Sequence, residues 1–228
     1  MLTITHFDTT PSQIIGQQVI DMAIEYFTEL SLSGTPPSSP LFPIHQAVMA
    51  VEMGTYLHSM GLDALRPIKL VVATDSAEPN LVVGFLKYLP LKDFDDACGV
   101  TYMAVRNGHR GRGIGRALMA ELLKRRPHTE LSCYVEKVPF YERMGLQVIG
   151  VRDTQVRMCT HPQSANGIMA VLDTQSRIHT PTVRMAAQTQ MQKYGAKAMR
   201  DAERQFSRHV ERRTRQANEF YLARTQGA

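Results

Sequence analysis

A turn rich in glycine and arginine, set between a strand-like and a helix-like segment, constrains this chain more than any other feature. Residues 105–118 read VRNGHRGRGIGRAL and hold four glycines and four arginines. Glycine lets the backbone approach a ligand with no Cβ in the way, and the first amides of a helix have no partner within that helix. Such amides bind anions with the help of the helix dipole. The turn therefore predicts a site for a phosphate-bearing ligand.

The spacing of the glycines distinguishes between known phosphate-binding patterns. A P-loop requires Lys followed by Ser or Thr after its last glycine, and this turn has neither. The dinucleotide pattern G-x-G-x-x-G requires glycine where Arg116 or Leu118 stands. Residues 110–115 instead read RGRGIG, which satisfies R-x-x-G-x-G directly after a strand-like segment that ends at Val105.

The rest of the chain alternates segments with strand-like and helix-like hydrophobic patterns. Helices cross over between strands in this order, which predicts an α/β fold with a mixed sheet. Apolar residues at helical spacing predict helices over 11–30, 44–61, 113–126 and 138–145. Runs of β-branched and aromatic residues between turn residues predict strands over 2–7, 67–75, 80–91, 99–105, 129–135, 146–152 and 154–161.

Basic residues are concentrated at the C-terminal end of the chain. The formal net charge is +5, and residues 181–228 hold ten Lys or Arg against four Asp or Glu, so the remaining chain is close to neutral. Apolar residues spaced three to seven apart, from 181 to about 223, predict one long amphipathic helix. We divide the chain into a domain over 1–162, a linker over 163–180 and a basic helix over 181–228.

The predicted C-terminal helix must cover its apolar stripe, and the sequence leaves three ways open. It can pack across the domain, pair with the same helix of a second chain in a homo-oligomer, or dock on a larger protein assembly. Its arginines can also contact nucleic acid, but aromatic residues are not interleaved with them as in nucleic-acid-binding segments. A solvated charged face also explains these arginines.

Cysteine and histidine spacing gives no sign of a disulfide framework or a metal site. The three cysteines, Cys98, Cys133 and Cys159, lack paired C-x-x-C spacing, and the eight histidines are scattered, so we expect no metal. The chain starts without a basic segment before an apolar run. Its most apolar stretch, 81–91, contains Lys87 and is too short to cross a membrane. We expect a cytoplasmic protein without a membrane segment.

Two segments, in this order, resemble the signatures of one enzyme family. Residues 103–123, MAVRNGHRGRGIGRALMAELL, resemble the acetyl-coenzyme A loop of the GNAT superfamily of N-acetyltransferases. Residues 131–150, LSCYVEKVPFYERMGLQVIG, resemble its second signature, a strand and a helix carrying F-Y-[EQ]-[KR]-x-G-[FL]. The resemblance covers residues 1–162. It implies a mixed, mostly antiparallel twisted sheet with flanking helices, followed here by a long C-terminal helix.

The resemblance implies acetyl-coenzyme A as the cofactor, and transfer of its acetyl group to a primary amine of a small molecule or a protein by direct attack in a ternary complex. The pantetheine arm would lie between two parted strands and bond to the main chain of residues 101–105. The pyrophosphate would lie on the amides of residues 110–116, beside arginines that supply charge for the 3′-phosphate or for steering. The implied cofactor-binding residues are Met103, Val105, Arg110, Gly111, Arg112, Gly113, Gly115 and Arg116.

The resemblance also implies a catalytic acid. Tyr141 takes the place of the family's tyrosine near the cofactor sulfur, whose phenol can protonate the departing thiolate. The strand before the glycine turn lacks the Asp, Glu or His that often serves as the base. An amine must lose a proton to attack, so a base or a water chain is required. The candidates, each of which also has an ordinary surface or hydrogen-bonded role, are Glu52, Asp95, Asp96, and Tyr102 acting through water.

Two departures from the family pattern leave a second function open. The base is missing from its usual strand, and Tyr134 and Lys137 stand where many members have Asn and Ala. A structural or assembly protein, such as a component of a phage particle, could keep the fold with weak or no activity and interact through its C-terminal helix. Binding of acetyl-coenzyme A distinguishes the two hypotheses.

Overall fold

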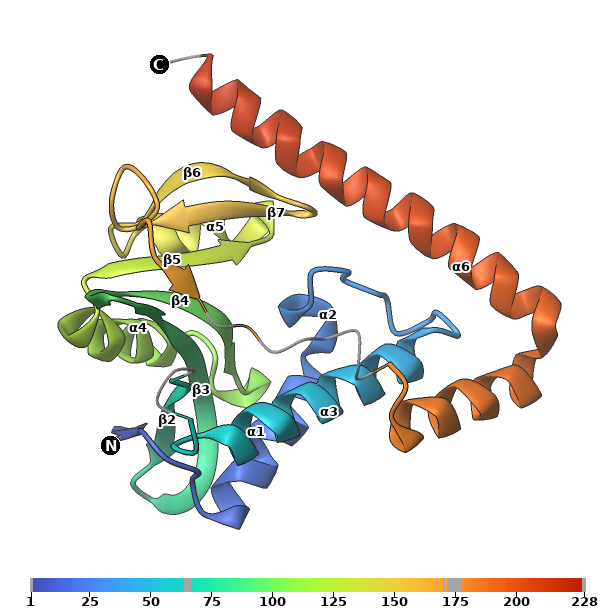
Figure 1. Cartoon of the computed structure of the whole chain (residues 1–228), viewed down its shortest axis with the longest axis horizontal. Helices are drawn as coiled ribbons and strands as arrows, with labels where there is room; N and C mark the ends of the chain where they lie inside the picture. Colours follow the sequence, from blue (N-terminus) through green and yellow to red (C-terminus); the bar gives the residue numbers. More distant parts are fainter. Residues whose placement is uncertain (1, 64–66, 170, 172–177, 227–228) are drawn as a thin grey trace.

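The computed structural model describes residues 2–63, 67–169, 171 and 178–226. The strands of this part of the chain are β1 (Leu2–Phe7), β2 (Lys69–Asp75), β3 (Glu78–Lys92), β4 (Phe94–Val105), β5 (His128–Cys133), β6 (Gln147–Arg152), β7 (Gln155–Cys159) and β8 (Ile168–Met169). They form one sheet in the order β1-β2-β3-β4-β5-β7-β6, with β8 beside β3 (Figure 1). Among these described pairs, β4 and β5 run parallel and the others antiparallel. The predicted mixed, mostly antiparallel sheet is confirmed.

Helices flank the sheet, as the sequence predicts. They are α1 (Gln13–Glu25), α2 (Phe27–Leu30), α3 (Phe42–Ser59), α4 (Ile114–Arg125), α5 (Val138–Glu142) and α6 (Pro181–Thr225), with short 3₁₀ helices η1 (Asn107–His109) and η2 (Val135–Lys137). The single helix predicted over 11–30 is divided, because Tyr26 has a φ of −97° and a ψ of 20° and separates α1 from α2. None of the described helices is long and apolar enough to cross a membrane.

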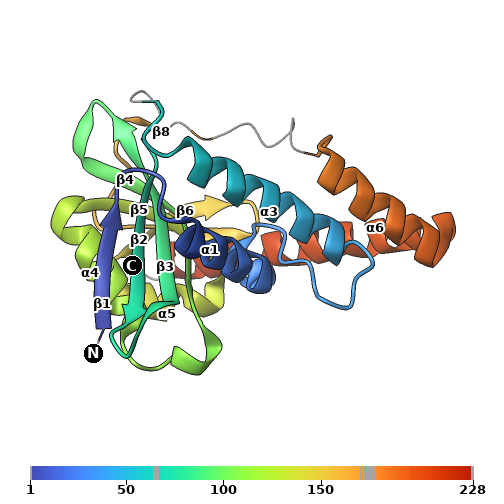
Figure 2. The same ribbon diagram turned by 90° about the horizontal axis from the view of Figure 1, so that it is seen from below.

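Both faces of the central strands are buried. Neighbouring strand residues point to opposite faces, so each strand contributes to two apolar cores. Val72 and Phe85 belong to the core under α1 and α3, whereas Val71 and Leu86 belong to the core under α4. Figure 2 shows α1 and α3 on one side of the sheet and α4 on the other. Because helices cover both faces of the sheet, the sequences of these strands are nearly continuous apolar runs.

The parallel strands β4 and β5 are paired along only part of their length. Ala97 lies opposite His128 and Val100 lies opposite Leu131, where the pairing ends. Beyond this point β4 continues beside β3 as far as Val105. The two strands therefore part in the middle of the sheet, next to the glycine turn that follows β4.

β4 begins earlier than the strand predicted from residue 99. The segment from Phe94 to Cys98 continues the ladder with β3, and Pro90 lies opposite Cys98. The reversal between the strands falls at Asp93, whose φ of 65° lies in the left-handed region that Asp tolerates better than most residues. The acidic segment that follows is therefore part of a β-hairpin.

The predicted long C-terminal helix is confirmed as α6, with a bend at Gly195, whose φ is 77°. Beyond the bend α6 crosses its own domain and contacts α3, η2, β6 and β7 (Figure 1). Met199 and Ala202 pack with Leu41, and Ala217 is fully buried in the core shared with α4. Of the three ways that the sequence leaves open, the structure shows packing across the domain.

The predicted linker over 163–180 contains a short strand. In β8, Met169 lies opposite Leu91 and Ile168 lies opposite Lys92, so the segment extends the edge of the sheet beside β3. The linker positions 170 and 172–177 lie outside the described residues.

Candidate active site

A cavity of about 600 Å³ opens where β4 and β5 part. Residues 100–105 of β4 line one side, residues 131–134 line the other, and the glycine turn and α5 complete the wall. Within the described chain, the main chain of residues 101–105 has no strand partner on the β5 side. An unpaired strand edge of this kind can bond to an extended ligand as it would to an added strand.

The glycine turn presents bare backbone to this cavity. Gly111 and Gly113 have φ values of 77° and 79°, which L side chains rarely adopt. A Cβ at either position would meet no described atom within 4 Å, so the space beside the turn is open. Gly113 is the N-cap of α4, and Ile114 and Gly115 of the first helical turn line the cavity. Helix N-terminal amides at an open surface suit the binding of a phosphate group.

The three arginines predicted to bind the cofactor differ in position. Arg110 and Arg116 line the cavity, together with Met103 and Val105 of β4. Arg112 is exposed and takes no part in the lining. Two of the three arginines therefore lie at the cavity, and Arg112 lies outside its lining.

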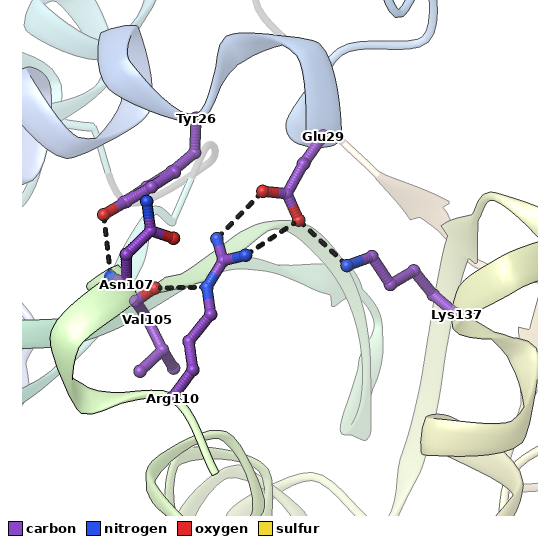
Figure 3. Close-up of polar contacts among 6 residues, drawn as sticks. All are labelled: Tyr26, Glu29, Val105, Asn107, Arg110 and Lys137. Atoms are coloured by element: carbon purple, nitrogen blue, oxygen red, sulfur yellow. Dashed lines mark hydrogen bonds and ion pairs between the residues drawn. The ribbon is translucent and has the colours of Figure 1, made fainter.

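Three charged residues form a bridge at the cavity that we call the Glu29 strap (Figure 3). The Glu29 carboxylate accepts hydrogen bonds from Arg110 Nη2 at 2.9 Å and from Lys137 Nζ at 2.8 Å. All three residues line the cavity. Burial alone would raise the pKa of Glu29, but the hydrogen bonds from Lys137 and Arg110 lower it below its ordinary value. The Glu29 carboxyl therefore stays ionised at neutral pH.

Arg110 makes two further contacts besides those of the Glu29 strap (Figure 3). Its Nε donates a hydrogen bond to Val105 O at 3.0 Å, and its guanidinium lies 4.9 Å from the centroid of the Tyr26 ring. The Tyr26 hydroxyl accepts a hydrogen bond from Asn107 N at 3.0 Å. The break between α1 and α2 thus anchors the glycine turn and places Glu29 beside it. Sequence reasoning missed this contact, because 81 residues separate Glu29 from Arg110.

Tyr141, the predicted acid, lies on α5 and lines the cavity. Burial and the neighbouring Cys133 raise the pKa of its phenol well above the ordinary value, so the phenol stays protonated at neutral pH. Its ring packs edge-on against Phe140, with the centroids 5.0 Å apart. A Cβ at Gly115 would lie 3.0 Å from Phe140, so this glycine permits the close approach of α4 and α5. Cys133 is a buried thiol whose pKa burial raises to about 12.

A second cavity of about 740 Å³ meets the first beside β4. Glu52 of α3 and Tyr102 of β4 both line it, and the Tyr102 hydroxyl donates a hydrogen bond to the Glu52 carboxylate at 2.8 Å. The structure therefore brings two of the predicted base candidates together. Tyr102 also lines the first cavity, and the residues common to both linings are Leu30, Val100, Thr101, Tyr102, Leu131, Ser132 and Gln155.

The other two base candidates lie elsewhere. Asp95 and Asp96 are exposed on the hairpin between β3 and β4 and line neither cavity. Their place on the chain directly before the predicted strand made them candidates, but the strand begins before them, so they lie along its exposed start. The geometry favours Glu52 and Tyr102.

A fully buried lysine lies beside the Glu52 and Tyr102 pair. Lys87 of β3 is 0% exposed, and its ammonium group lies 3.1 Å from the centroid of the Tyr56 ring and 5.1 Å from that of Tyr102. A cation over aromatic rings is stabilised by their quadrupoles. The sequence shows Lys87 only as an interruption of an apolar run, so this charge next to the second cavity was not predicted.

α6 takes part in the second cavity although it lies far along the chain. Phe206 lines that cavity, and its ring centroid lies 5.1 Å from that of His45 on α3. Arg213 stacks on Tyr134, 4.6 Å from the ring centroid, and the Tyr134 hydroxyl donates a hydrogen bond to Ser31 O at 2.6 Å. α6 thus packs against Tyr134, which lines the first cavity.

Comparisons with known proteins identify the class of this domain. A family model described as an acetyltransferase (GNAT) domain matches residues 67–148. No curated protein matches the chain. The PaiA N-acetyltransferase of Thermoplasma acidophilum, solved with coenzyme A, is 14% identical, with a TM-score of 0.51 over 68% of this chain and 97% of that one. An acyl-CoA N-acyltransferase from Pseudomonas aeruginosa is 15% identical, with a TM-score of 0.50 over 71% and 100%.

Other matched structures are spanned only in part. The chain covers 64% of a nourseothricin acetyltransferase, at 22% identity and a TM-score of 0.35 over 40% of this chain. It covers 44% of a tandem GNAT protein from the clavulanic acid biosynthesis pathway, at 20% identity and a TM-score of 0.45 over 65% of this chain. The family model thus matches a GNAT acetyltransferase domain over residues 67–148, the two structures share the fold, and the long helix α6 lies outside the matched residues.

Proposed function

We propose that this chain is an N-acetyltransferase that transfers an acetyl group from acetyl-coenzyme A to a primary amine by direct attack in a ternary complex. The observation that carries the proposal is the parting of β4 and β5 beyond Val100 and Leu131, next to a glycine turn with open space at Gly111 and Gly113. The coenzyme A complex of the PaiA N-acetyltransferase, whose fold this chain shares, supports the choice of cofactor.

The residues of the first cavity suit the successive parts of the cofactor. The free edge of β4, with Met103 and Val105, can bond to the amides of the pantetheine arm. The turn amides at Gly111, Gly113 and Gly115 would hold the pyrophosphate. Arg110 and Arg116, which line the same cavity, would neutralise its charge, and Arg112 contributes only at longer range.

The two cavities suggest how this chain moves protons during the transfer. When bound, acetyl-coenzyme A supplies a thioester carbonyl that an amine can attack. Glu52 is an acceptor for the amine proton, either through a water molecule or through the Tyr102 hydroxyl, which is hydrogen-bonded to Glu52. Tyr141 is a proton donor to the sulfur of the departing thiolate, since its phenol is protonated and lines the first cavity. The amine acceptor itself would enter through the second cavity.

Cofactor binding tests the proposal through the glycine turn. We expect calorimetry to detect binding of acetyl-coenzyme A and a screen of amines to detect thiol release. Gly113→Val should weaken cofactor binding at least about tenfold, because a β-branched residue is strained at φ 79° and would shift the amides that follow. Gly108→Val is the matched control, since Gly108 lies in the same turn with open space and without a positive φ.

The absence of binding by the unaltered protein at millimolar cofactor would overturn the proposal. Equal affinities of Gly113→Val and Gly108→Val would show that the turn does not hold the pyrophosphate.

The Glu29 strap leads to a separate prediction, because Arg110 and Lys137 cannot bond fully to both Glu29 and a phosphate group. Glu29→Gln should tighten the binding of acetyl-coenzyme A about two- to fivefold, as expected for release of a half-exposed ion pair of about 0.5 to 1 kcal/mol. Glu121→Gln makes the same change of charge on α4, where Glu121 pairs with Lys124 and Arg125, and should leave the affinity unchanged. Weaker binding by Glu29→Gln would mean that the strap supports the turn.

The alternative of an assembly protein stays a prediction. It was suggested in part by an amphipathic helix in need of a partner, and α6 covers Met199, Ala202 and Ala217 against its own domain. Contacts of α6 with a second chain, a larger particle or nucleic acid also stay predictions.

A further inference from the structure

Three side chains of types that commonly bind metals lie together where β5 begins and β7 ends. His128, Cys159 and His161 each place one ligand atom within 4.8 Å of the other two. His128 also lines the second cavity, whereas Cys159 and His161 line neither cavity, and none of the three moves a proton in the proposed acetyl transfer. We propose that these residues form a site for one Zn²⁺ ion, contrary to the expectation from sequence spacing.

The strand pairing explains how residues so far apart in the sequence come together. His128 begins β5 and Cys159 ends β7, and these antiparallel strands are neighbours, with Glu130 opposite Cys159. The next residue, Thr160, donates its amide to Thr129 O at 3.0 Å and keeps the chain beside β5. His161 therefore lies beside the start of β5.

The hydrogen bonds of His161 determine which of its ring nitrogens carries a proton. The Thr160 hydroxyl donates to Pro127 O at 2.6 Å, so toward other partners it is an acceptor. His161 Nδ1 lies 3.1 Å from this hydroxyl oxygen and must be the donor. The lone pair of the neutral ring is therefore at Nε2, where a metal can bind.

The same reasoning applies to His128. Its Nε2 lies 3.2 Å from Gln163 O, and a carbonyl oxygen can only accept, so Nε2 carries the proton and Nδ1 the lone pair. Histidines that bind metals usually donate the other ring N–H to a carbonyl, carboxylate or hydroxyl, as both of these do. The two rings stack with centroids 4.1 Å apart and planes inclined by 22°.

Cys159 supplies the third ligand. It is fully buried, and its Sγ lies 3.3 Å from His161 N and 3.6 Å from Gln163 O. Binding of Zn²⁺ would replace the thiol proton, which leaves to solvent, and form a Zn–S bond. Two imidazoles and one thiolate are typical zinc ligands, and a water molecule can take the fourth position beside the exposed His161.

A bound zinc ion would fix the spacing of the three ligand atoms. Bonds of 2.0 to 2.3 Å in tetrahedral geometry separate ligand atoms by about 3.3 to 3.8 Å, less than the present limit of 4.8 Å. His161 is the exposed member of the three and can move most readily. A bound ion would join the start of β5, the end of β7 and the segment that leads to β8, so zinc should also raise the melting temperature.

The test uses the full-length protein, freed of metal with a chelator and titrated with zinc chloride by calorimetry. We expect one zinc per chain, and an absorption band of thiolate-to-cobalt charge transfer when Co²⁺ replaces it. Loss of a ligand should weaken zinc binding by at least the 10- to 100-fold that loss of a ligand's hydrogen-bond partner typically costs. His161→Ala should show this loss, and Cys159→Ala should also lose the cobalt band.

His58→Ala, at an exposed position of α3, and Cys133→Ala, at the other end of β5, are the matched controls and should bind zinc as the unaltered protein does. If Cys159→Ala does not fold, the exposed His161 variant decides. No zinc binding at micromolar concentration, or equal binding by His161→Ala and His58→Ala, would overturn the proposal. These measurements need no acetyl transfer, so their outcome is separate from that of the proposed function.

Discussion

We expect Tyr141→Phe to lower kcat for acetyl transfer by about 100-fold or more, in the range of general acid catalysis, and to change the affinity for acetyl-coenzyme A by less than about twofold. The phenol is the group lost, while the ring that packs against Phe140 remains. Because burial raises the pKa of Tyr141, the acid form is present at all lower pH values and is lost only as the pH rises through that raised pKa. The wild-type protein should therefore lose no acid-dependent activity between pH 6 and about pH 10.

The control for this variant is another buried tyrosine. Tyr88→Phe removes a phenol whose pKa burial raises to about 12, at a position that lines neither cavity, where the hydroxyl lies 2.8 Å from His6 Nε2. Steady-state kinetics and calorimetry on both variants separate chemistry from binding. Equal kcat values for Tyr141→Phe and Tyr88→Phe would remove Tyr141 from the mechanism.

Glu52→Gln is expected to lower kcat/KM for the amine by about 100-fold near neutral pH, because the amide cannot accept the amine's proton. Glu52→Gln keeps an oxygen that can accept the Tyr102 hydrogen bond, so the fold of the cavity wall is preserved. Glu203→Gln, on the exposed side of α6, is the control.

Tyr102→Phe distinguishes two routes to Glu52. A loss as large as that of Glu52→Gln would indicate that the proton passes through the Tyr102 hydroxyl. A much smaller loss would indicate transfer through water. If Glu52→Gln keeps the rate of the unaltered protein, the base is another group and this part of the mechanism is wrong.

The sequence predicts the elements of this fold well where the signal is local. The glycine turn, the strand that ends at Val105 and the helix that starts beside it are specified by residues next to one another. The break at Tyr26 and the bend at Gly195 were missed, because each interrupts a pattern that stays apolar and helical on both sides. The early start of β4 was missed because its acidic residues resemble a turn.

The candidate site depends on contacts that no local pattern encodes. Glu29 and Lys137 reach the first cavity from distant elements, and Lys87 lies over a tyrosine ring of the second; these contacts follow only from the packing of the helices on the sheet. Arg112 illustrates the converse. It belongs to the motif, yet its side chain is exposed outside the cavity, because the direction of a side chain in a glycine turn depends on φ values that the sequence does not specify.

Because α6 lines part of the second cavity, residues that shape this cavity and residues of the first cavity lie on separate parts of the chain. Phe206 belongs to α6, which lies outside the matched residues 67–148, whereas Tyr141 and the glycine turn lie within them and Glu52 lies on α3. Under the proposed function, substitutions along the C-terminal helix would change the size and polarity of the second cavity without altering Tyr141, Glu52 or the glycine turn. Chains that share this domain but carry different C-terminal extensions would then diverge in substrate choice while retaining one chemistry.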